Sequence, residues 1–160
     1  MHIDLTADQR QLQTEIRAYM AGLMTPALED ELHKGEGGGP EYMAALHKMG
    51  DDGWLGIGWP SEWGGQARGP IEQFLFFDEV QRAGFPVPIL TLNTVGPALM
   101  KFGNDAQKAR YLPKMATGRH LFSIGYTEPG AGTDLAALRT KAVPDGDDYV
   151  ISGQKIWTSL

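Results

Sequence analysis

Apolar residues recur at helical spacing through the first two-thirds of the chain. The first such series lies on one face of an expected helix and consists of Leu5, Leu12, Ile16, Tyr19 and Leu23. Thr6 stands at the start of this series, and threonine caps helix N-termini by accepting a backbone N–H. We therefore predict a helix that begins after Thr6, and we expect Pro26 to end it or to kink it.

Four further segments have helical patterns, at residues 40–53, 70–84, 87–103 and 104–118. The segment 70–84 carries apolar residues around one wide face, which predicts a largely buried helix. These residues are Ile71, Phe74, Leu75, Phe77 and Val80. At the start of the last segment, Asn104 precedes Gln107 in the outline of a capping box. The intervening loop "WLGIGWPSEWGGQARGP" holds three tryptophans, which we interpret as packing residues rather than a ligand site.

The hydrophobic period changes near residue 120. The stretch "HLFSIGYT" is a short apolar run before a turn, and residues 138–159 read as strands joined by the turn "PDGDD". We predict a mainly α fold followed by a β segment, with an all-α helical bundle domain at 1–118 and the opening strands of a β-barrel-like domain at 119–160. A sheet of so few strands needs partners to cover its face and edges, so we expect the chain to be the first part of a longer protein.

Charge and composition exclude several classes of protein. The 14 Lys and Arg against 20 Asp and Glu give a net charge of -6, and no basic block occurs, which argues against nucleic acid and anionic membranes as partners. The longest apolar runs are far shorter than the roughly 20 residues of a membrane span. The chain has no cysteine and no secretory signal, so we expect a cytoplasmic protein. The histidines do not have metal-ligand spacing, and we predict no metal site.

The stretch "YTEPGAGTD", residues 126–134, is the first candidate site. Its glycines allow successive backbone N–H groups to point at one spot beside the Thr133 hydroxyl, an arrangement that suits a phosphate. The alternative is a Gly/Pro turn between two strands. The stretch is not a helical dinucleotide fingerprint, because Leu135 stands where a third glycine is needed.

The second candidate is "IWTS" near the end of the sequence. In an extended strand Trp157 and Ser159 share one face, while Thr158 points the other way. An aromatic plane beside a hydroxyl suits a planar heteroaromatic ligand. The alternative is a half-buried strand with a packed tryptophan.

Together these stretches resemble the flavin-binding segment of acyl-CoA dehydrogenases. In that family a T-E-P-x-x-G-[ST]-D turn is followed some twenty-five residues later by G-x-K-x-W, and both halves are present here at family spacing. The segments "WPSEWGGQARGPIEQFLFFDEVQRAG" and "FGNDAQKARYLPKMATGRH" extend the resemblance over nearly the whole chain. The resemblance implies FAD as cofactor and α,β-dehydrogenation of an acyl-CoA thioester, with hydride transfer to flavin N5.

The resemblance also implies roles for individual residues. Thr127 would meet the isoalloxazine edge, Thr133 would lie near the pyrophosphate and the thioester, and Trp157 would flank the flavin. The full set of implied cofactor-binding residues is Ile124, Gly125, Tyr126, Thr127, Glu128, Gly132, Thr133, Trp157, Thr158 and Ser159. The implied substrate-lining residues are Thr133, Thr91, Asn93 and Thr94.

No residue of this sequence is implied as the catalytic base, because the family places that glutamate in a C-terminal helical domain. We therefore expect the 160-residue chain alone to be inactive. The family further implies an electron-transfer flavoprotein as partner and a homo- or hetero-oligomer. "GYTEPGAGTDLAALRT" with "KIWTS" is similar to actinobacterial members that act on bulky acyl-CoAs, including steroid-derived ones. Two alternatives stay open: a non-catalytic subunit that completes a partner's site, and an acyl-CoA oxidase or monooxygenase.

Overall fold

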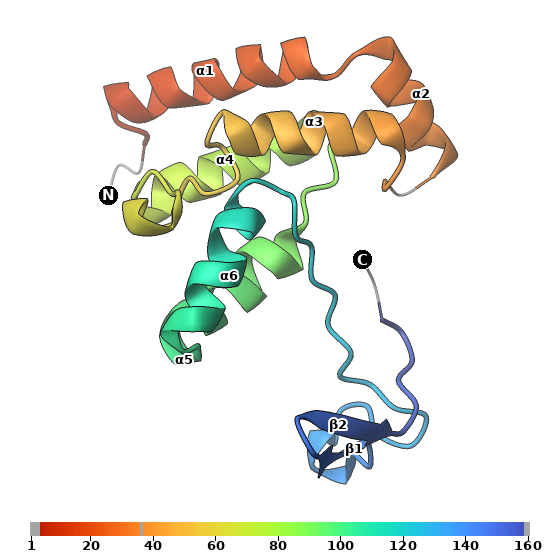
Figure 1. Cartoon of the computed structure of the whole chain (residues 1–160). Coiled ribbons are helices and arrows are strands. Elements are labelled where there is room, and N and C mark those ends of the chain that lie inside the picture. Colours follow the sequence, from red (N-terminus) through yellow and green to blue (C-terminus); the bar gives the residue numbers. More distant parts are fainter. Residues whose placement is uncertain (1–3, 36, 159–160) are drawn as a thin grey trace. The chain divides into compact units, whose positions relative to one another are not determined.

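The computed structural model describes residues 4–35 and 37–158. The chain divides into two compact units, residues 1–121 and residues 122–160. The first unit is helical (Figure 1) and contains α1 (Ala7–Leu23), α2 (Pro26–Lys34), α3 (Pro40–Asp51), the 3₁₀ turn η1 (Ser61–Trp63), α4 (Pro70–Arg82), the π-helical turn η2 (Thr91–Val95), α5 (Gly96–Phe102) and α6 (Asp105–Ala116). The second unit contains the 3₁₀ turn η3 (Leu135–Ala137) and the strands β1 (Lys141–Asp145) and β2 (Asp148–Ser152). This order confirms the predicted mainly α fold with a following β segment.

The predicted helix caps are present. The Thr6 hydroxyl accepts the N–H of Gln9 at 3.2 Å, and the Gln9 side chain accepts the N–H of Thr6 at 3.0 Å. Asn104 and Gln107 form the same reciprocal pair at the start of α6. Pro26 does not kink α1, which ends at Leu23. It is the first residue of α2, where its missing N–H costs nothing because the first helical turn has no partner for that group.

The sequence predicted that α4 is largely buried, and this is wrong for one of its faces. Leu75, Phe76 and Val80 are buried, but Ile71 is 49% exposed and Phe74 is 63% exposed. The physical reason is that the buried stripe of α4 is the one that faces α1, and Ile71 and Phe74 lie on the opposite side of the helix. Glu79 belongs to the buried stripe because Arg17 and Gln13 of α1 satisfy its carboxylate. α1 packs along α4 through this contact.

Glycine permits a close contact where α3 ends. Gly50 is buried, and a β-carbon at this position would overlap the backbone of Thr117, which follows α6. α3 also packs against α2, and α6 packs against α5. The helices of the first unit therefore enclose one core, whose fully buried side chains include Ile16, Leu46 and Phe76.

The tryptophan-rich loop is part of this core, as predicted. Trp59 is 3% exposed, and its indole Nε1 donates to the carbonyl of Leu92 at 3.0 Å. The indole lies so close to Gly96 that a β-carbon there would overlap it. Trp54 stacks on Phe76 with ring centroids 6.0 Å apart.

The segment 87–103 is helical from residue 89 to residue 102, with a π-helical turn in its middle. In this turn the carbonyl of Thr91 accepts the N–H of Gly96, five residues later. The same register would pair the carbonyl of Leu92 with residue 97, which is a proline without an N–H. The Trp59 indole supplies the missing donor.

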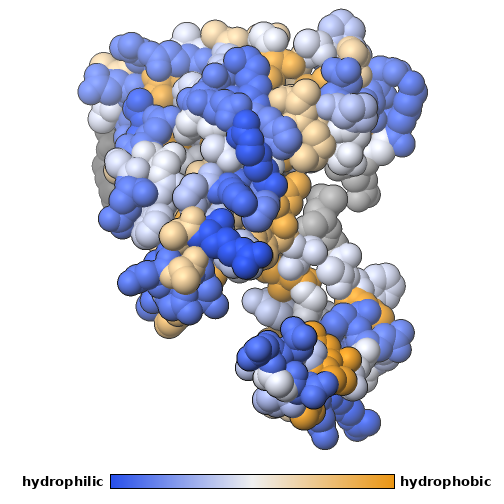
Figure 2. All heavy atoms as spheres, in the orientation of Figure 1, coloured by the Kyte–Doolittle hydropathy of each residue, from blue (hydrophilic) through white to orange (hydrophobic). Residues whose placement is uncertain are grey.

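In the second unit β1 and β2 form the predicted antiparallel hairpin, with Lys141 opposite Ser152 and Asp145 opposite Asp148. Gly146 has a φ of 62°, and Asp147 is not among the described residues with positive φ, which is the pattern of a type II′ turn. Val143, Val150 and Ile151 are exposed, and Figure 2 shows orange apolar surface on this unit.

The strands are shorter than the sequence indicated. Residues 121–127 and 153–158 have no regular secondary structure, and β2 ends at Ser152. Trp157 has a φ of 58°, so it is not part of an extended strand. The expectation that Trp157 and Ser159 share a strand face assumed an extended strand through Trp157, and this assumption is wrong. Ser159 itself lies outside the described residues.

Candidate functional site

The structure brings the two candidate stretches of the second unit together. The carbonyl of Thr127 accepts the backbone N–H of Ile156 at 3.0 Å. Beside this bond, Lys155 Nζ donates to the carbonyl of Tyr126 at 3.1 Å. The turn that begins at Tyr126 and the segment that leads to Trp157 therefore lie side by side.

Gly125 lies in the same contact. A β-carbon at Gly125 would stand 3.6 Å from the Thr158 hydroxyl and 3.6 Å from the Lys155 side chain. These are ordinary van der Waals distances, so the two segments approach closely without strain. Gly125, Thr127, Lys155 and Thr158 form one local cluster.

The buried side chain of Glu128 stabilises the turn by accepting hydrogen bonds from neighbouring segments. Its side chain is buried, and its carboxylate accepts the backbone N–H of Arg139 at 2.7 Å and that of Thr140 at 2.9 Å. Lys155 Nζ donates to the same carboxylate at 2.9 Å. The backbone of Glu128 also exchanges two hydrogen bonds with Ala131, which closes the turn. The side chain of Glu128 therefore organises the protein rather than facing a ligand.

The donors around Glu128 hold the pKa of its carboxyl well below its usual range. The nearby Thr140 hydroxyl, the N–H of Arg139 and the Lys155 ammonium all favour the charged form. The Thr140 hydroxyl is buried but has no hydrogen-bond partner of good geometry in the described part of the chain. We therefore attribute the lowered pKa mainly to the backbone N–H groups and Lys155. Glu128 is a carboxylate at any physiological pH.

The remaining predicted residues of this unit surround the cluster with accessible groups. Trp157 is 83% exposed and Tyr126 is 58% exposed. Gly132 and Thr133 are exposed, and a β-carbon at Gly132 would meet no atom within 4 Å. The hydroxyls of Thr127 and Thr133 have no hydrogen-bond partner among the described residues. Ile124 is half-buried.

The predicted substrate-lining residues Thr91, Asn93 and Thr94 belong to the first unit. They lie in the π-helical turn η2, where Thr91 is buried and the other two are exposed. The Asn93 carboxamide oxygen accepts the Gln73 side-chain amide at 3.3 Å. Hydrophobic periodicity did not indicate this π-helical turn, a feature often found at functional sites.

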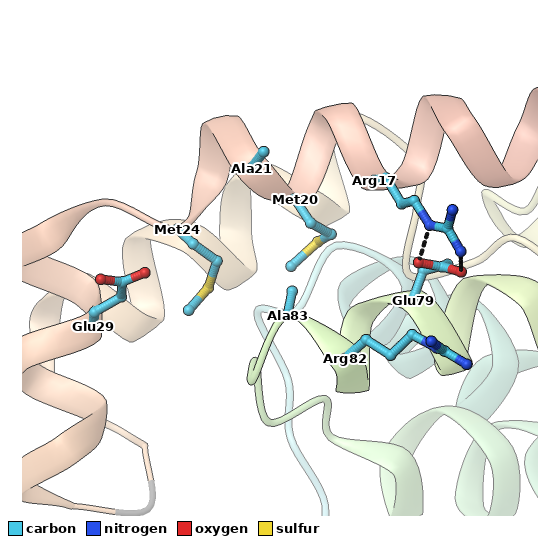
Figure 3. Close-up of a pocket in the computed structure, with 8 residues that line it drawn as sticks. All are labelled: Arg17, Met20, Ala21, Met24, Glu29, Glu79, Arg82 and Ala83. Carbon is cyan, nitrogen blue, oxygen red and sulfur yellow. Dashed lines mark hydrogen bonds and ion pairs between the residues drawn. The ribbon is translucent and has the colours of Figure 1, made fainter.

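A surface pocket of about 440 Å³ opens in the first unit (Figure 3), and none of the predicted site residues is among those that line it. Met20 and Met24 approach Ala83 there, and Arg17 reaches across from α1 to the Glu79 carboxylate. Both Arg17 donor nitrogens lie 2.7 Å from carboxylate oxygens, and this pair lowers the pKa of Glu79. The Arg17 and Glu79 side chains at this pocket are thus paired with each other.

The described residues contain neither a cluster suited to a metal ion nor a helix suited to span a membrane. Among them, no three or more His, Cys, Asp and Glu residues gather in a way that could hold a metal ion. No helix in this part of the chain combines the length and apolarity needed to cross a bilayer.

Comparison with known proteins identifies the family of this fold and site. Residues 6–119 match the model of the family described as "Acyl-CoA dehydrogenase, N-terminal domain". The chain therefore belongs to the acyl-CoA dehydrogenase family, whose members are oxidoreductases. It is 54% identical to acyl-CoA dehydrogenase FadE26 of Mycobacterium tuberculosis, and the match covers 100% of this chain and 41% of that protein.

Solved structures agree with this assignment. The crystal structure of the ChsE4-ChsE5 complex from Mycobacterium tuberculosis matches with a TM-score of 0.91 and 52% identity, over 100% of this chain and 40% of that one. The Tcur3481-Tcur3483 steroid ACAD matches with a TM-score of 0.90 and 53% identity, over 99% and 41%. An acyl-CoA dehydrogenase of Bacillus anthracis complexed with FAD matches with a TM-score of 0.78 and 28% identity, over 97% and 27%. The chain thus spans about two-fifths of the first two relatives.

Proposed function

We propose that the protein carrying this chain is an FAD-dependent acyl-CoA dehydrogenase that introduces an α,β double bond into an acyl-CoA thioester. One observation carries the proposal beyond family membership. The turn with Thr127 and the segment with Trp157 meet through the Ile156 N–H, which joins the two halves expected of a flavin site.

The accessible groups of this cluster fit a flavin. An indole that is 83% exposed offers a plane for stacking on a planar ring system. Thr127 offers a hydroxyl that has no partner in the described part of the chain, and the open backbone at Gly132 leaves space for a phosphate beside Thr133. When bound, FAD would supply the hydride acceptor for the reaction.

The proposed roles of this chain are binding and orientation. Thr127 meets the edge of the ring, Trp157 flanks it, and Thr133 binds near the pyrophosphate and thioester. Thr91, Asn93 and Thr94 line part of the acyl cavity. The carboxylate that removes the α-proton is proposed to lie in sequence beyond this chain, since the match covers 41% of the FadE26 length.

For the substrate class and assembly, we propose a bulky, steroid-derived acyl-CoA and a hetero-oligomer. The names of two relatives support this: one is a steroid ACAD, and another is the ChsE4-ChsE5 complex. We propose an electron-transfer flavoprotein as the electron acceptor. The match to one member of a complex also favours a second candidate, a subunit that completes the flavin site of its partner without its own catalytic base.

The test uses the intact protein, purified alone and with any partner that co-purifies. A stoichiometric flavin absorbance and acyl-CoA-dependent reduction of an electron-accepting dye support the dehydrogenase. Oxygen consumption in place of dye reduction indicates an oxidase instead. Flavin and dye reduction that occur only in the presence of the partner indicate the completing subunit. Absence of flavin from every preparation contradicts the proposal.

A further inference from the structure

We propose that Lys155 is a positioning residue that fastens the Trp157 segment to the Thr127 turn. The proposal rests on the proposed flavin site, of which it names a supporting part. Neither the motif roles nor the comparisons assign Lys155 a function.

The contacts of Lys155 single it out. Its ammonium donates to two acceptors on the turn, the carbonyl of Tyr126 at 3.1 Å and Glu128 Oε1 at 2.9 Å. The Lys155 side chain is 29% exposed and the Glu128 side chain is 7% exposed, so the ion pair is shielded from water. Charge-assisted bonds of this kind are stronger than neutral ones.

Glu128 cannot hold the Trp157 segment without Lys155. The other two donors to its carboxylate are the backbone N–H groups of Arg139 and Thr140, which tie the turn to the residues before β1. Within residues 4–35 and 37–158, only Lys155 connects the carboxylate to the segment after β2. In the described residues, the hydrogen bonds between this segment and the turn are the two that Lys155 donates and the backbone bond from Ile156 to Thr127.

The fastened segment carries a residue with an unusual backbone. Trp157 has a φ of 58°, a region that bulky side chains rarely adopt and that surrounding structure must enforce. Lys155 and Ile156 are the two residues before it, and both are bonded to the turn. The Lys155 bridge therefore determines where the exposed indole stands relative to Thr127.

The test compares Lys155→Met and Lys155→Arg with Lys141→Met in the intact protein. Lys141 is the matched control, since it lies exposed on β1 of the same unit and has no side-chain partner among the described residues. We expect Lys155→Met to weaken FAD binding about tenfold, the effect of one charge-assisted hydrogen bond. We also expect stronger flavin fluorescence in its holoprotein, because the quenching indole is displaced. Lys155→Arg should recover most of both properties, and Lys141→Met should change neither.

Hydrogen exchange of the flavin-free protein separates this proposal from the function on which it rests. Lys155→Met should speed amide exchange in residues 126–140 and 155–157, whether or not flavin binds. If the wild type never binds FAD, the proposed function fails, and unchanged exchange in Lys155→Met would refute the positioning role as well. If the wild type binds FAD and Lys155→Met binds it equally well with an unchanged spectrum, the proposed function stands and the role of Lys155 is wrong.

Discussion

Replacing Trp59 by Phe should expose a weakness at the π-helical turn η2. The substitution keeps an aromatic ring but removes the indole N–H, which is the donor that the carbonyl of Leu92 accepts at 3.0 Å. No backbone group can take over, because the π-helical register directs this carbonyl to Pro97. Both Trp59 and Leu92 are buried, so water cannot easily replace the bond.

The cost follows from two contributions. A buried carbonyl left without a donor costs about 1–3 kcal/mol. The smaller ring also leaves a void beside Gly96, where the indole now packs, and a void of this kind adds about 1 kcal/mol. We therefore expect Trp59→Phe to lower the free energy of unfolding by about 2–4 kcal/mol.

Urea denaturation of the intact protein, followed by circular dichroism, measures this change. The control is Trp63→Phe, the same substitution in the same loop at a half-buried tryptophan whose indole N–H has no hydrogen-bond partner among the described residues. That variant should stay within about 0.5 kcal/mol of the wild type.

Pro97→Ala provides the decisive second change. It supplies an N–H at the position that the Leu92 carbonyl faces in the π-helical register, so it should recover about 1 kcal/mol or more in the Trp59→Phe background. Two results would show that the indole does not replace the missing proline N–H. One is that the changes in the free energy of unfolding caused by Trp59→Phe and Pro97→Ala simply add in the double variant. The other is that Trp59→Phe lowers the free energy of unfolding no more than Trp63→Phe does.

Two further predictions concern the helical unit. Gly50→Ala should destabilise it by about 1–3 kcal/mol, because its β-carbon would overlap backbone, whereas Gly22→Ala, also at the penultimate residue of a helix but in open space, should stabilise it by about 0.5 kcal/mol. The lowered pKa of Glu79 makes its stabilising effect complete above the ordinary value of 4.5 and lost as pH falls through the folded-state pKa. Glu79→Gln should therefore reduce the loss of stability that accompanies acidification below about pH 4.5.

Denaturant unfolding curves measure the stability of the two glycine variants and of Glu79→Gln. Equal effects of the two glycine substitutions would contradict the close contact at Gly50. The Glu79 variant requires stability measured across a pH series, with Glu29→Gln as the control, since this exposed residue has no side-chain hydrogen bond or ion pair in the described part of the chain. A slope with pH that is the same in Glu79→Gln and the wild type would show that the Arg17 pair does not contribute to acid stability.

Local signals explain which parts of the fold could be predicted. The caps at Thr6 and Asn104 and the Gly146 turn depend on residues a few positions apart, and the structure contains all three. The helix α2 was missed because a proline can either end one helix or begin the next. The prediction of which α4 residues are buried was partly wrong, because apolar residues around most of a helix do not show which stripe faces the core.

The roles of the site residues stay a prediction, and the sequence did not reveal how the two site stretches are arranged. The spacing of the two motifs indicated Thr127 and Trp157, yet it did not reveal that Trp157 leaves the extended conformation. The Glu128–Lys155 pair joins residues 27 apart, and the Trp59–Leu92 bond joins residues 33 apart. Contacts over such distances depend on how the whole unit packs, which local periodicity does not record.

The bridge between Glu128 and Lys155 also makes the intervening hairpin a closed loop, fastened at its base and free at its tip. The entropic cost of closing a loop rises only with the logarithm of its length, so extra residues at the tip hardly weaken the base. Gly146 and Asp147 form that tip, and both are exposed. The hairpin is therefore a natural point of insertion, where a reporter peptide or a docking sequence can be carried while the two halves of the site stay joined.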